Sequence, residues 1–568
     1  MTTARPGKKS VPATRSRAAR SAAVAVRPAS SPRAELLALH RRIWQENKRR
    51  IDSGTQDDTG ELARYRGPYT RATSKYREVV TFAKMVDYAL GTNRDAIYVG
   101  DYHTSKQSQK CYLKLVRRLH EKKQKLVLAL ELIDSRYQKQ IDRFLAGALS
   151  ESEFLKKIQF EKNWPFGNWE NFRPIFDFAR ETATPILAID TKIDGADSLT
   201  RRDRHAAEIL GRSHLSYPKR DRVHVTLIGD LHIAPSHLPN AVDEVILRLG
   251  PARTNATGHF CVYQNSEKIY WKLAEQGLER SAEVVQIDDS SFCVMNTPPI
   301  ILQQTYLNWL ERDEEALDYS DARGEFLTLL KRISGFLDVP LPKEAEDVEV
   351  YTCGDLSFLD RLRDRRLFAE SEIAEIKRQI RSAESYMIPR GKIVYLANLS
   401  TNHAAEEASH FLKILCAPEE LPKEYVAAFY ANALHEAIGF FGSKIINDRR
   451  KTPHEAEFEG ILKSNDDYGP LARRVAKLVL EHKALERGRI RQNLAAMYSQ
   501  PVDVFIGVTH ALGYMLGEKL FYGMVAGQVR KSRVRDLYFD PFTAPGRARK
   551  LYFELLGEVR DVRIPERS

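Results

Sequence analysis

A chain of 568 residues is too long for one ordinary domain, so two or three domains are expected. Hydrophobic residues make up 43% and charged residues 29%, as in soluble globular proteins, which argues against a disordered or a membrane-embedded chain. The net charge is +12, but residues 1–34 contain eight Lys or Arg and no acidic residue, so the rest carries only +4. The sequence therefore gives no strong nucleic-acid signal, and it predicts a disordered basic tail over residues 1–34.

Five cysteines are scattered along the chain without a Cys-x-x-Cys pair, which argues against a disulfide framework and against a zinc ribbon. We expect them to be reduced core residues and the protein to be cytoplasmic. No apolar stretch approaches the length of a transmembrane span. The cysteines are Cys111, Cys261, Cys293, Cys353 and Cys416.

Residues 35–69 are predicted to form a helical lead-in and linker. Apolar residues recur at helical spacing between Glu35 and Asn47, and residues 51–70 are polar and contain Gly and Asp. A further helix is predicted over residues 76–90 from the same spacing.

Short apolar runs alternate with helical stripes from residue 70 to residue 305. The run before His103, the helix after it and the run before Glu131 predict a βαβ unit, whose right-handed crossover makes the two strands parallel and adjacent. Residues 70–305 are therefore predicted to form an α/β domain with a mostly parallel sheet flanked by helices. Further strands are predicted at 185–190, 258–263, 283–287 and 292–295.

The α/β half contains two Gly-Asp-x-His elements, at the ends of the apolar runs 97–103 and 225–232. In an open α/β sheet the carboxyl ends of parallel strands lie at one edge, and ligands bind there. His103 and His232 are therefore expected to converge, together with Glu131, which directly follows a third apolar run. A single such His is more often a capping or loop residue, but the repeat and Glu131 together favour one three-residue site.

Two imidazoles and a carboxylate suit a divalent transition metal such as Zn, Mn or Fe, with open positions for water or substrate. His103, Glu131 and His232 are therefore candidate metal ligands. The same side chains also suit metal-free acid–base chemistry, in which a neutral His deprotonates water while Glu131 or Asp101 orients it. Arg173 or Arg202 would stabilise a developing anion, although each is more often a surface or salt-bridging residue. Arg202 joins His103, Glu131 and His232 as the candidate catalytic residues.

Residues 306–568 are predicted to form a mostly α-helical domain, because helical stripes dominate there. The segment from Glu407 to His410 has the Glu-x-x-His spacing of carboxylate metal bundles, and His435 and Glu436 follow on a later stripe. A second Glu-x-x-His is missing, so pairing along the helix face is the favoured interpretation. The size of this domain also predicts an interaction role, in which it recruits a protein partner.

The α/β half also resembles a known family. The resemblance is carried by the paired Gly-x-x-His elements, Glu131 after a buried run, and the stretches Gln140 to Leu155 and Trp169 to Ile189. Over residues 95–300 these features look like the ChaN-type haem-binding domain of the Tiki/TraB superfamily. Arg202 followed by Asp203 is similar to a helix start in TraB and Tiki relatives.

The resemblance implies haem binding linked to iron uptake, with Tyr102, His103 and His232 as candidate cofactor-binding residues, because Tyr and His both ligate haem iron. Tiki proteins are metal-dependent peptidases and the erythromycin-esterase branch hydrolyses a lactone, so a metal-dependent hydrolase of a peptide or ester is the alternative. The positions that match the superfamily are His103, Glu131, Arg202 and His232. An interaction scaffold with a vestigial site is a second alternative.

Overall fold

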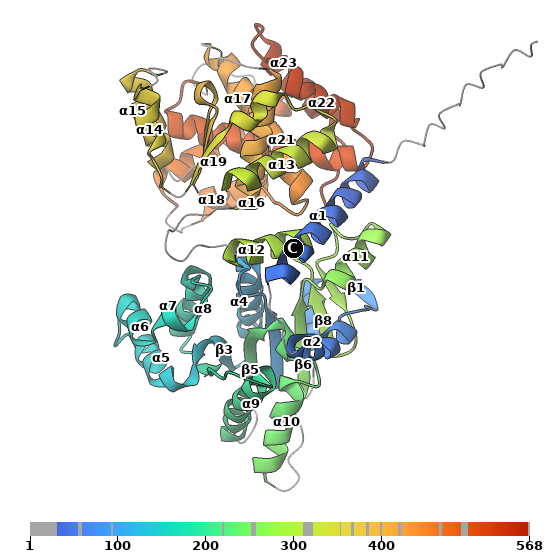
Figure 1. Cartoon of the computed structure of the whole chain (residues 1–568), viewed down its shortest axis with the longest axis vertical. Helices are drawn as coiled ribbons and strands as arrows, with labels where there is room; N and C mark the ends of the chain where they lie inside the picture. The colour runs from blue at the N-terminus through green and yellow to red at the C-terminus, as the bar shows by residue number, and fades with distance from the viewer. Residues whose placement is uncertain are drawn as a thin grey trace, which may run out of the picture.

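The computed structural model of the chain consists of an α/β body and a helical body, which lie one above the other in Figure 1. The predicted tail lies outside the described residues as far as residue 30, and α1 (Pro32–Gly54) follows it. The structure describes residues 31–54, 60–91, 95–217, 221–251, 257–310, 322–352, 354–364, 368–381, 385–397, 400–417, 422, 424–464, 468–489 and 498–565.

The α/β body is built on an eight-stranded sheet in the order β1-β7-β8-β6-β2-β5-β3-β4. All neighbouring strands from β8 to β4 pair in parallel, whereas β7 and β1 pair antiparallel at one edge. The predicted mostly parallel sheet is confirmed. The strands are β1 (Glu78–Val80), β2 (Ala96–Asp101), β3 (Leu126–Asp134), β4 (Ile186–Asp190), β5 (Val223–Gly229), β6 (His259–Gln264), β7 (Val284–Gln286) and β8 (Ser291–Val294).

Two local predictions about this sheet were wrong. β2 and β3 are parallel but not adjacent, because β5 lies between them and pairs with both. The segment 76–90 is not one helix, because its β-branched residues Val79 and Val80 form the edge strand β1 before α3 begins at Phe82.

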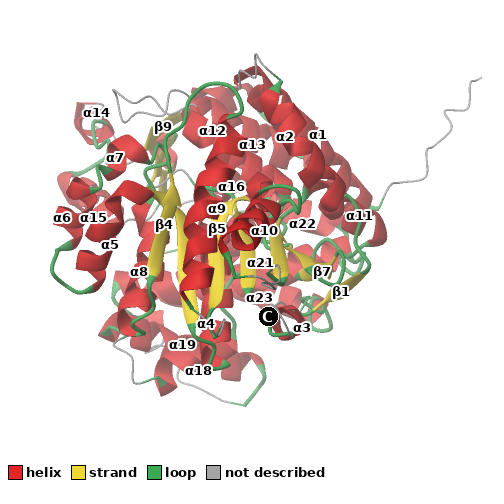
Figure 2. Ribbon diagram, turned by 90° about the horizontal axis from the view of Figure 1, so that it is seen from below, coloured by secondary structure: helices red, strands yellow, loops and turns green. Residues whose placement is uncertain are grey.

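Helices cover both faces of the sheet. The core on one face contains side chains of α3, α4 and α8, and the core on the other face contains side chains of α9, α10 and α11. Figure 2 shows α9 and α10 crossing in front of the strands. The helices of this body are α2 (Glu61–Ala72), α3 (Phe82–Ala89), α4 (Lys106–Glu121), α5 (Gln138–Leu145), α6 (Glu151–Lys157), α7 (Phe160–Asn163), α8 (Trp169–Glu181), α9 (Ser198–Ser216), α10 (Leu238–Leu249) and α11 (Glu267–Gln276).

The helical body contains the predicted helices and also a small three-stranded sheet of β10, β11 and β9. These strands are β9 (Glu349–Thr352), β10 (Tyr386–Ile388) and β11 (Ile393–Leu396). The helices are α13 (Ala322–Leu337), α14 (Phe358–Asp364), α15 (Glu370–Arg381), α16 (Thr401–Cys416), α17 (Tyr425–Ile446), α18 (Glu455–Lys463), α19 (Pro470–Glu486), α21 (Val502–Val525), α22 (Lys531–Phe539) and α23 (Arg547–Glu558).

Helix α1 and helix α12 (Pro299–Leu310) pack together where the two bodies meet (Figure 1). Leu36 of α1 and Ile300 of α12 both belong to the core of the helical body. Arg33 forms an ion pair with Glu279 of the α/β body at 3.0 Å. The predicted lead-in helix therefore connects the two bodies, and the predicted boundary near residue 305 falls inside α12.

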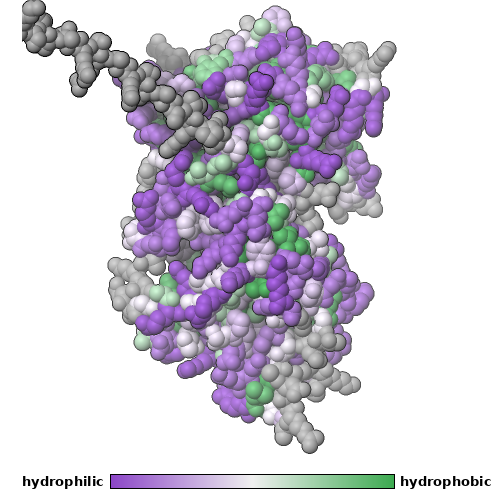
Figure 3. All heavy atoms as spheres, turned by 90° about the vertical axis from the view of Figure 1, so that its right-hand side faces the viewer, coloured by the Kyte–Doolittle hydropathy of each residue, from purple (hydrophilic) through white to green (hydrophobic). Residues whose placement is uncertain are grey.

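Most of the surface face in Figure 3 is hydrophilic, with hydrophobic side chains in small separate patches. Among the described helices, none combines the length and the apolar content that crossing a membrane requires. Cys111, Cys261 and Cys293 are buried free thiols and Cys416 is a half-buried one, whereas Cys353 lies outside the described residues.

Candidate functional site

The side chains of His103, Glu131 and His232 converge above Gly229, the last residue of β5. A Cβ atom placed on Gly229 would lie 3.4 Å from His103 Nε2, 3.5 Å from Glu131 Oε2 and 3.3 Å from His232 Cδ2. β5 lies between β2 and β3, so the three side chains leave three neighbouring strands at the carboxyl edge of the sheet. We call these three residues and Arg202 the edge cluster.

His103 follows β2 and is held by Asp101, the last residue of that strand. Its Nδ1 lies 2.9 Å from Asp101 Oδ2, and Gln109 donates to the other Asp101 oxygen at 2.6 Å. Burial opposes a charged imidazole, but the hydrogen bond to Asp101 and the charge of Glu131 hold the pKa of His103 above its ordinary value. With Nδ1 bonded to a carboxylate, Nε2 is the nitrogen that faces Glu131, at 3.7 Å.

His232 lies in a 3-10 turn (Asp230–Ile233) after β5 and has the same kind of support from another element. Its Nδ1 lies 2.7 Å from Oδ1 of Asp203 on α9, and its Nε2 faces Glu131 Oε1 at 3.9 Å. The hydroxyl of Tyr65 donates to the other Asp203 oxygen and lies 2.8 Å from His232 Nδ1. Both histidines thus have Nδ1 on an aspartate and Nε2 toward Glu131, the arrangement in which imidazoles ligate metals.

Glu131 lies within β3 rather than after it, because the strand continues to Asp134 past a register shift against β4. One of its oxygens accepts from Arg202 at 2.5 Å, and the other accepts from the Gly229 backbone N–H at 2.6 Å. Burial opposes ionisation of Glu131, but the Arg202 guanidinium and the two imidazoles lower its pKa to about 2. Arg202 also donates to Asp190 at 2.8 Å, so it ties the ends of β3 and β4 together.

Aromatic side chains flank His103. The rings of Trp164 and Phe166 lie 5.0 Å and 4.9 Å from its imidazole, centroid to centroid, and Asn168 donates to its carbonyl oxygen at 2.6 Å. Phe166 in turn contacts Trp309 of α12. The aromatic residues between α7 and α8 therefore form a wall of the edge cluster, while Trp169 at the start of α8 is part of the core.

Tyr102 has a different electrostatic environment from the residues of the edge cluster. After burial, the groups with the largest effect on its phenol are Glu267, Tyr306 and Arg66. Burial raises the pKa of Tyr102. The candidate cofactor ligands His103 and His232 are thus brought together by the structure, whereas the Tyr102 hydroxyl has a different environment.

Tyr65 and Asp203 complete the site but were not among its predicted residues. Tyr65 lies in α2, within the segment 51–70 that was predicted to be a polar connector. The helical spacing of Tyr65, Tyr69 and Ala72 was the available signal, because Tyr69 and Ala72 both pack on the core under α9, α10 and α11. Asp203 was predicted only to form part of a helix start together with Arg202.

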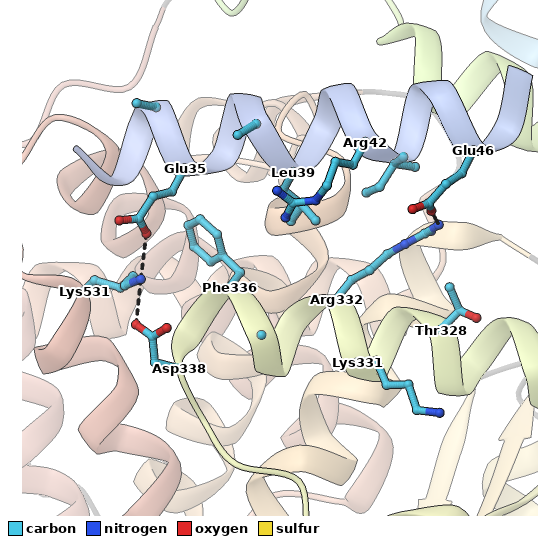
Figure 4. Close-up of a pocket in the computed structure, with 14 residues that line it drawn as sticks. Glu35, Leu39, Arg42, Glu46, Thr328, Lys331, Arg332, Phe336, Asp338 and Lys531 are labelled. Carbon is cyan, nitrogen blue, oxygen red and sulfur yellow. Dashed lines mark hydrogen bonds and ion pairs between the residues drawn. The ribbon is translucent and has the colours of Figure 1, made fainter. Parts of the chain in front are cut away.

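A separate cleft of about 730 Å³ lies between α1 and α13, and it shares no residue with the edge cluster (Figure 4). Lys531 bridges Glu35 at 2.7 Å and Asp338 at 2.8 Å at one end, and Arg332 pairs with Glu46 at 2.8 Å at the other. Side chains of the cleft are thus already paired with one another across it.

Residues 88–226 match the family model described as haem-binding uptake, Tiki superfamily, ChaN. The predicted ChaN resemblance is confirmed over these residues. The matched ChaN segment includes His103, Glu131, Arg202 and Asp203, and ends just before His232.

The solved structures include a match described as "Cofacial heme binding to ChaN of Campylobacter jejuni". It is 13% identical and covers 38% of this chain and 92% of that chain, with a TM-score of 0.25, which is too low to support an argument about fold or site. No curated protein matches this chain.

Proposed function

We propose that the α/β body binds haem at the edge cluster, with His103 as the ligand of the iron. The observation that carries the proposal is that His103, within the segment that matches the haem-binding family, is a partly exposed imidazole beside the rings of Trp164 and Phe166. The aromatic rings supply the apolar contacts that haem sites use, and imidazole is a common ligand of haem iron.

The donor set fits haem iron chemically. Asp101 accepts a hydrogen bond from Nδ1 of His103, which leaves Nε2 as the unprotonated nitrogen of the neutral ring. Gln109 holds Asp101 in place, and Asn168 fixes the backbone of His103. When bound, haem supplies a redox-active iron and an extended aromatic surface. Arg202 lowers the pKa of Glu131 and so keeps this carboxylate ionised next to the iron ligand.

One observation favours a second function, metal-dependent hydrolysis of an ester or peptide. Both imidazoles direct Nε2 at Glu131, at 3.7 Å and 3.9 Å, and the side chain of His232 is only 6% exposed. A small ion would meet both nitrogens in that position, whereas a macrocycle has access only to His103, whose side chain is 23% exposed. In this function His103, His232 and Glu131 would hold the ion, which would supply an activated water, and Arg202 would stabilise the oxyanion.

A hemin titration and an elemental analysis of the same purified proteins separate the two functions. Haem binding at His103 predicts a Soret band in the wild type that is lost in His103→Ala and kept in His232→Ala. Metal-dependent hydrolysis predicts a bound transition metal that both variants lose. His259→Ala is the matched control, because His259 has the same 23% exposure and also pairs with an aspartate, Asp243, but lies away from the edge cluster.

If the wild type shows no Soret band and both variants lose a bound metal equally, haem binding is contradicted and metal-dependent hydrolysis is favoured. If the wild type shows neither a Soret band nor a bound transition metal, the results favour a vestigial site and an interaction role for the helical body. A pull-down that compares the full chain with Glu131→Ala would then test whether partner binding is independent of the edge cluster.

A further inference from the structure

Three helices of the helical body bring a second group of metal-ligand side chains together. Glu406 and His410 lie on α16, and Glu436 lies on α17. One ligand atom from each of these three residues lies within 4.8 Å of the other two, and all three residues are buried. His510 of α21 approaches from a third helix, with Nε2 3.1 Å from Glu436 Oε1. We call Glu406, His410 and Glu436 the bundle cluster.

Two polar atoms of the bundle cluster have no hydrogen-bond partner. These are Oε1 of Glu406 and Nε2 of His410, in residues that are 4% and 6% exposed. A buried polar atom without a partner is destabilising, and buried carboxylates and imidazoles are normally paired or coordinate a metal. The other oxygen of Glu406 is paired with Arg450 at 2.7 Å, so the unpartnered oxygen belongs to a side chain that is held in place.

The backbone at the cluster is shaped to fit these side chains. A Cβ on Gly439 of α17 would lie 2.1 Å from His410 Nε2, so a larger residue would displace the imidazole. A Cβ on Gly513 of α21 would lie 2.5 Å from the Cβ of Glu436. Glycine at these two positions lets the three helices approach closely enough for the ligand atoms to meet.

The charges at the cluster favour a cation. Glu406, Glu407 and Glu436 bring three carboxylates into a buried space, and Arg450 is the cation paired with Glu406. Glu407 Oε2 lies 3.6 Å from His410 Nδ1, so it orients the imidazole as carboxylates orient metal-bound histidines. The imidazole of His435 stacks on His410 at 4.2 Å. His435 and His510 are only partly buried.

We propose that Glu406, His410 and Glu436 bind one divalent transition-metal ion inside the helical body. Glu407 positions His410, and His510 positions Glu436 or joins the ligand set. The spacing from Glu407 to His410 favoured pairing along one helix face, and the two side chains do lie 3.6 Å apart, but the structure also brings Glu436 of α17 to the same imidazole. An imidazole among carboxylates selects ions of the Mn, Fe and Zn class over Ca²⁺ and Mg²⁺, which prefer oxygen ligands only.

The test uses the full chain with His103→Ala and His232→Ala, so that the edge cluster contributes no metal. After chelation, the protein is titrated separately with Co²⁺, Mn²⁺ and Zn²⁺, and the Co²⁺ spectrum reports ligation directly. We expect one equivalent to bind, to raise Tm with the logarithm of metal concentration, and to resist competition by Mg²⁺ and Ca²⁺. Adding His410→Ala or Glu436→Gln should abolish the spectrum and the Tm shift, and Glu407→Gln should weaken binding about 10- to 100-fold.

His482→Gln is the matched control. His482 is a fully buried histidine of the same body with both nitrogens partnered, by Glu486 and Tyr430, so its loss should leave the metal stoichiometry unchanged. If the edge-site double variant is unstable, the same titration of the wild-type chain with and without Glu436→Gln must differ by one equivalent. No bound ion in either background, or an ion retained by both His410→Ala and Glu436→Gln, would overturn the proposal.

Discussion

The edge cluster and the bundle cluster contain similar side chains but differ in how completely these are paired within the protein. At the sheet edge both oxygens of Glu131 accept hydrogen bonds, and both imidazoles have Nδ1 on an aspartate. In the helical body Glu406 Oε1 and His410 Nε2 are buried without a partner. Internal hydrogen bonds offset the cost of burying the polar groups of the edge cluster. In the bundle cluster this cost is not offset, so a bound cation would stabilise that cluster more.

The ionisation of the two clusters follows the same difference. Arg202 helps to lower the pKa of Glu131 to about 2, so the edge cluster keeps its negative carboxylate over the whole ordinary pH range. Burial opposes a charged His410, but Glu407, Glu436 and Glu406 raise its pKa to about 9. The edge cluster therefore contains the fixed cation of Arg202, whereas in the bundle cluster the surrounding carboxylates favour a protonated His410.

Removing Glu131 should have the largest effect on stability, because it breaks the pairing that distinguishes the edge cluster. Glu131→Ala leaves Arg202 with Asp190 alone and takes the acceptor from the Gly229 N–H. Breaking a buried pair from one side costs about 3 kcal/mol or more in the free energy of unfolding. Urea denaturation monitored by circular dichroism measures the loss.

The control for this prediction is Glu151→Ala, which breaks the exposed pair of Glu151 with Arg173 at 3.1 Å. An exposed pair contributes roughly 0–1 kcal/mol, so the control should unfold nearly as the wild type does. Equal losses for the two variants would show that the pairing at the edge cluster does not stabilise the fold.

A smaller, pH-dependent effect should come from Asp230, the aspartate of the second Gly-Asp-x-His element. Burial raises its pKa to about 7, with hydrogen bonds from Tyr69 and the Gln264 backbone only partly opposing this. The folded state therefore binds the proton more tightly than the unfolded state does, and this contribution to stability is lost as pH rises from about 4 to about 7. Asp230→Asn removes the titration, so wild type should lose about 2 kcal/mol more than the variant between pH 5 and pH 8, at roughly 1.4 kcal/mol per pKa unit.

Urea denaturation of both proteins at the two pH values checks this prediction. Comparing the difference between the proteins, rather than the wild type alone, cancels the contributions of other titrating groups. A difference that is the same at pH 5 and pH 8 would show that Asp230 is ionised in the folded protein at both.

The edge cluster was predictable because strand ends leave a sheet at a common edge. A polar residue after an apolar run is therefore placed by the strand itself, and His103, Glu131 and His232 meet although β2 and β3 are not adjacent. The sequence repeat did not reveal that its two aspartates act differently. Asp101 bonds its own His103, whereas Asp230 packs against Gly100, where a Cβ would lie 1.7 Å from its Oδ1, and His232 bonds Asp203 instead.

The bundle cluster was not predictable, because it depends on which helices pack against each other. A helical stripe shows which residues share a face, but it does not say which other helix that face meets. The sequence therefore offered His435 and Glu436 as a further His and Glu without showing that Glu436 meets His410. Tyr65 was missed because a tyrosine within a polar segment reads as a connector residue until α2 is seen to pack beside α9. For Glu436 the missing information was the tertiary pairing of two predicted helices, whereas for Tyr65 helix α2 itself was not predicted.

The smallest effect on stability, and the sharpest test of the comparison, should come from Gly229→Ala. Gly229 has φ −45° and ψ 134°, a conformation that alanine adopts without strain. The added methyl group would lie 3.3–3.5 Å from His232, His103 and Glu131, close enough to require shifts of only a few tenths of an ångström. We therefore expect a loss of less than about 1 kcal/mol in the free energy of unfolding. The methyl group nevertheless fills the space beside His103 Nε2, Glu131 Oε2 and His232 Cδ2, so a small ion held there should be lost completely. Haem bound by His103 at the exposed side of the cluster should instead be retained with weakened affinity.

Measuring metal content, the Soret band and urea stability on this one variant thus distinguishes a ligand inside the edge cluster from one at its exposed side. Unchanged binding of both ligands would show that neither uses the space above Gly229.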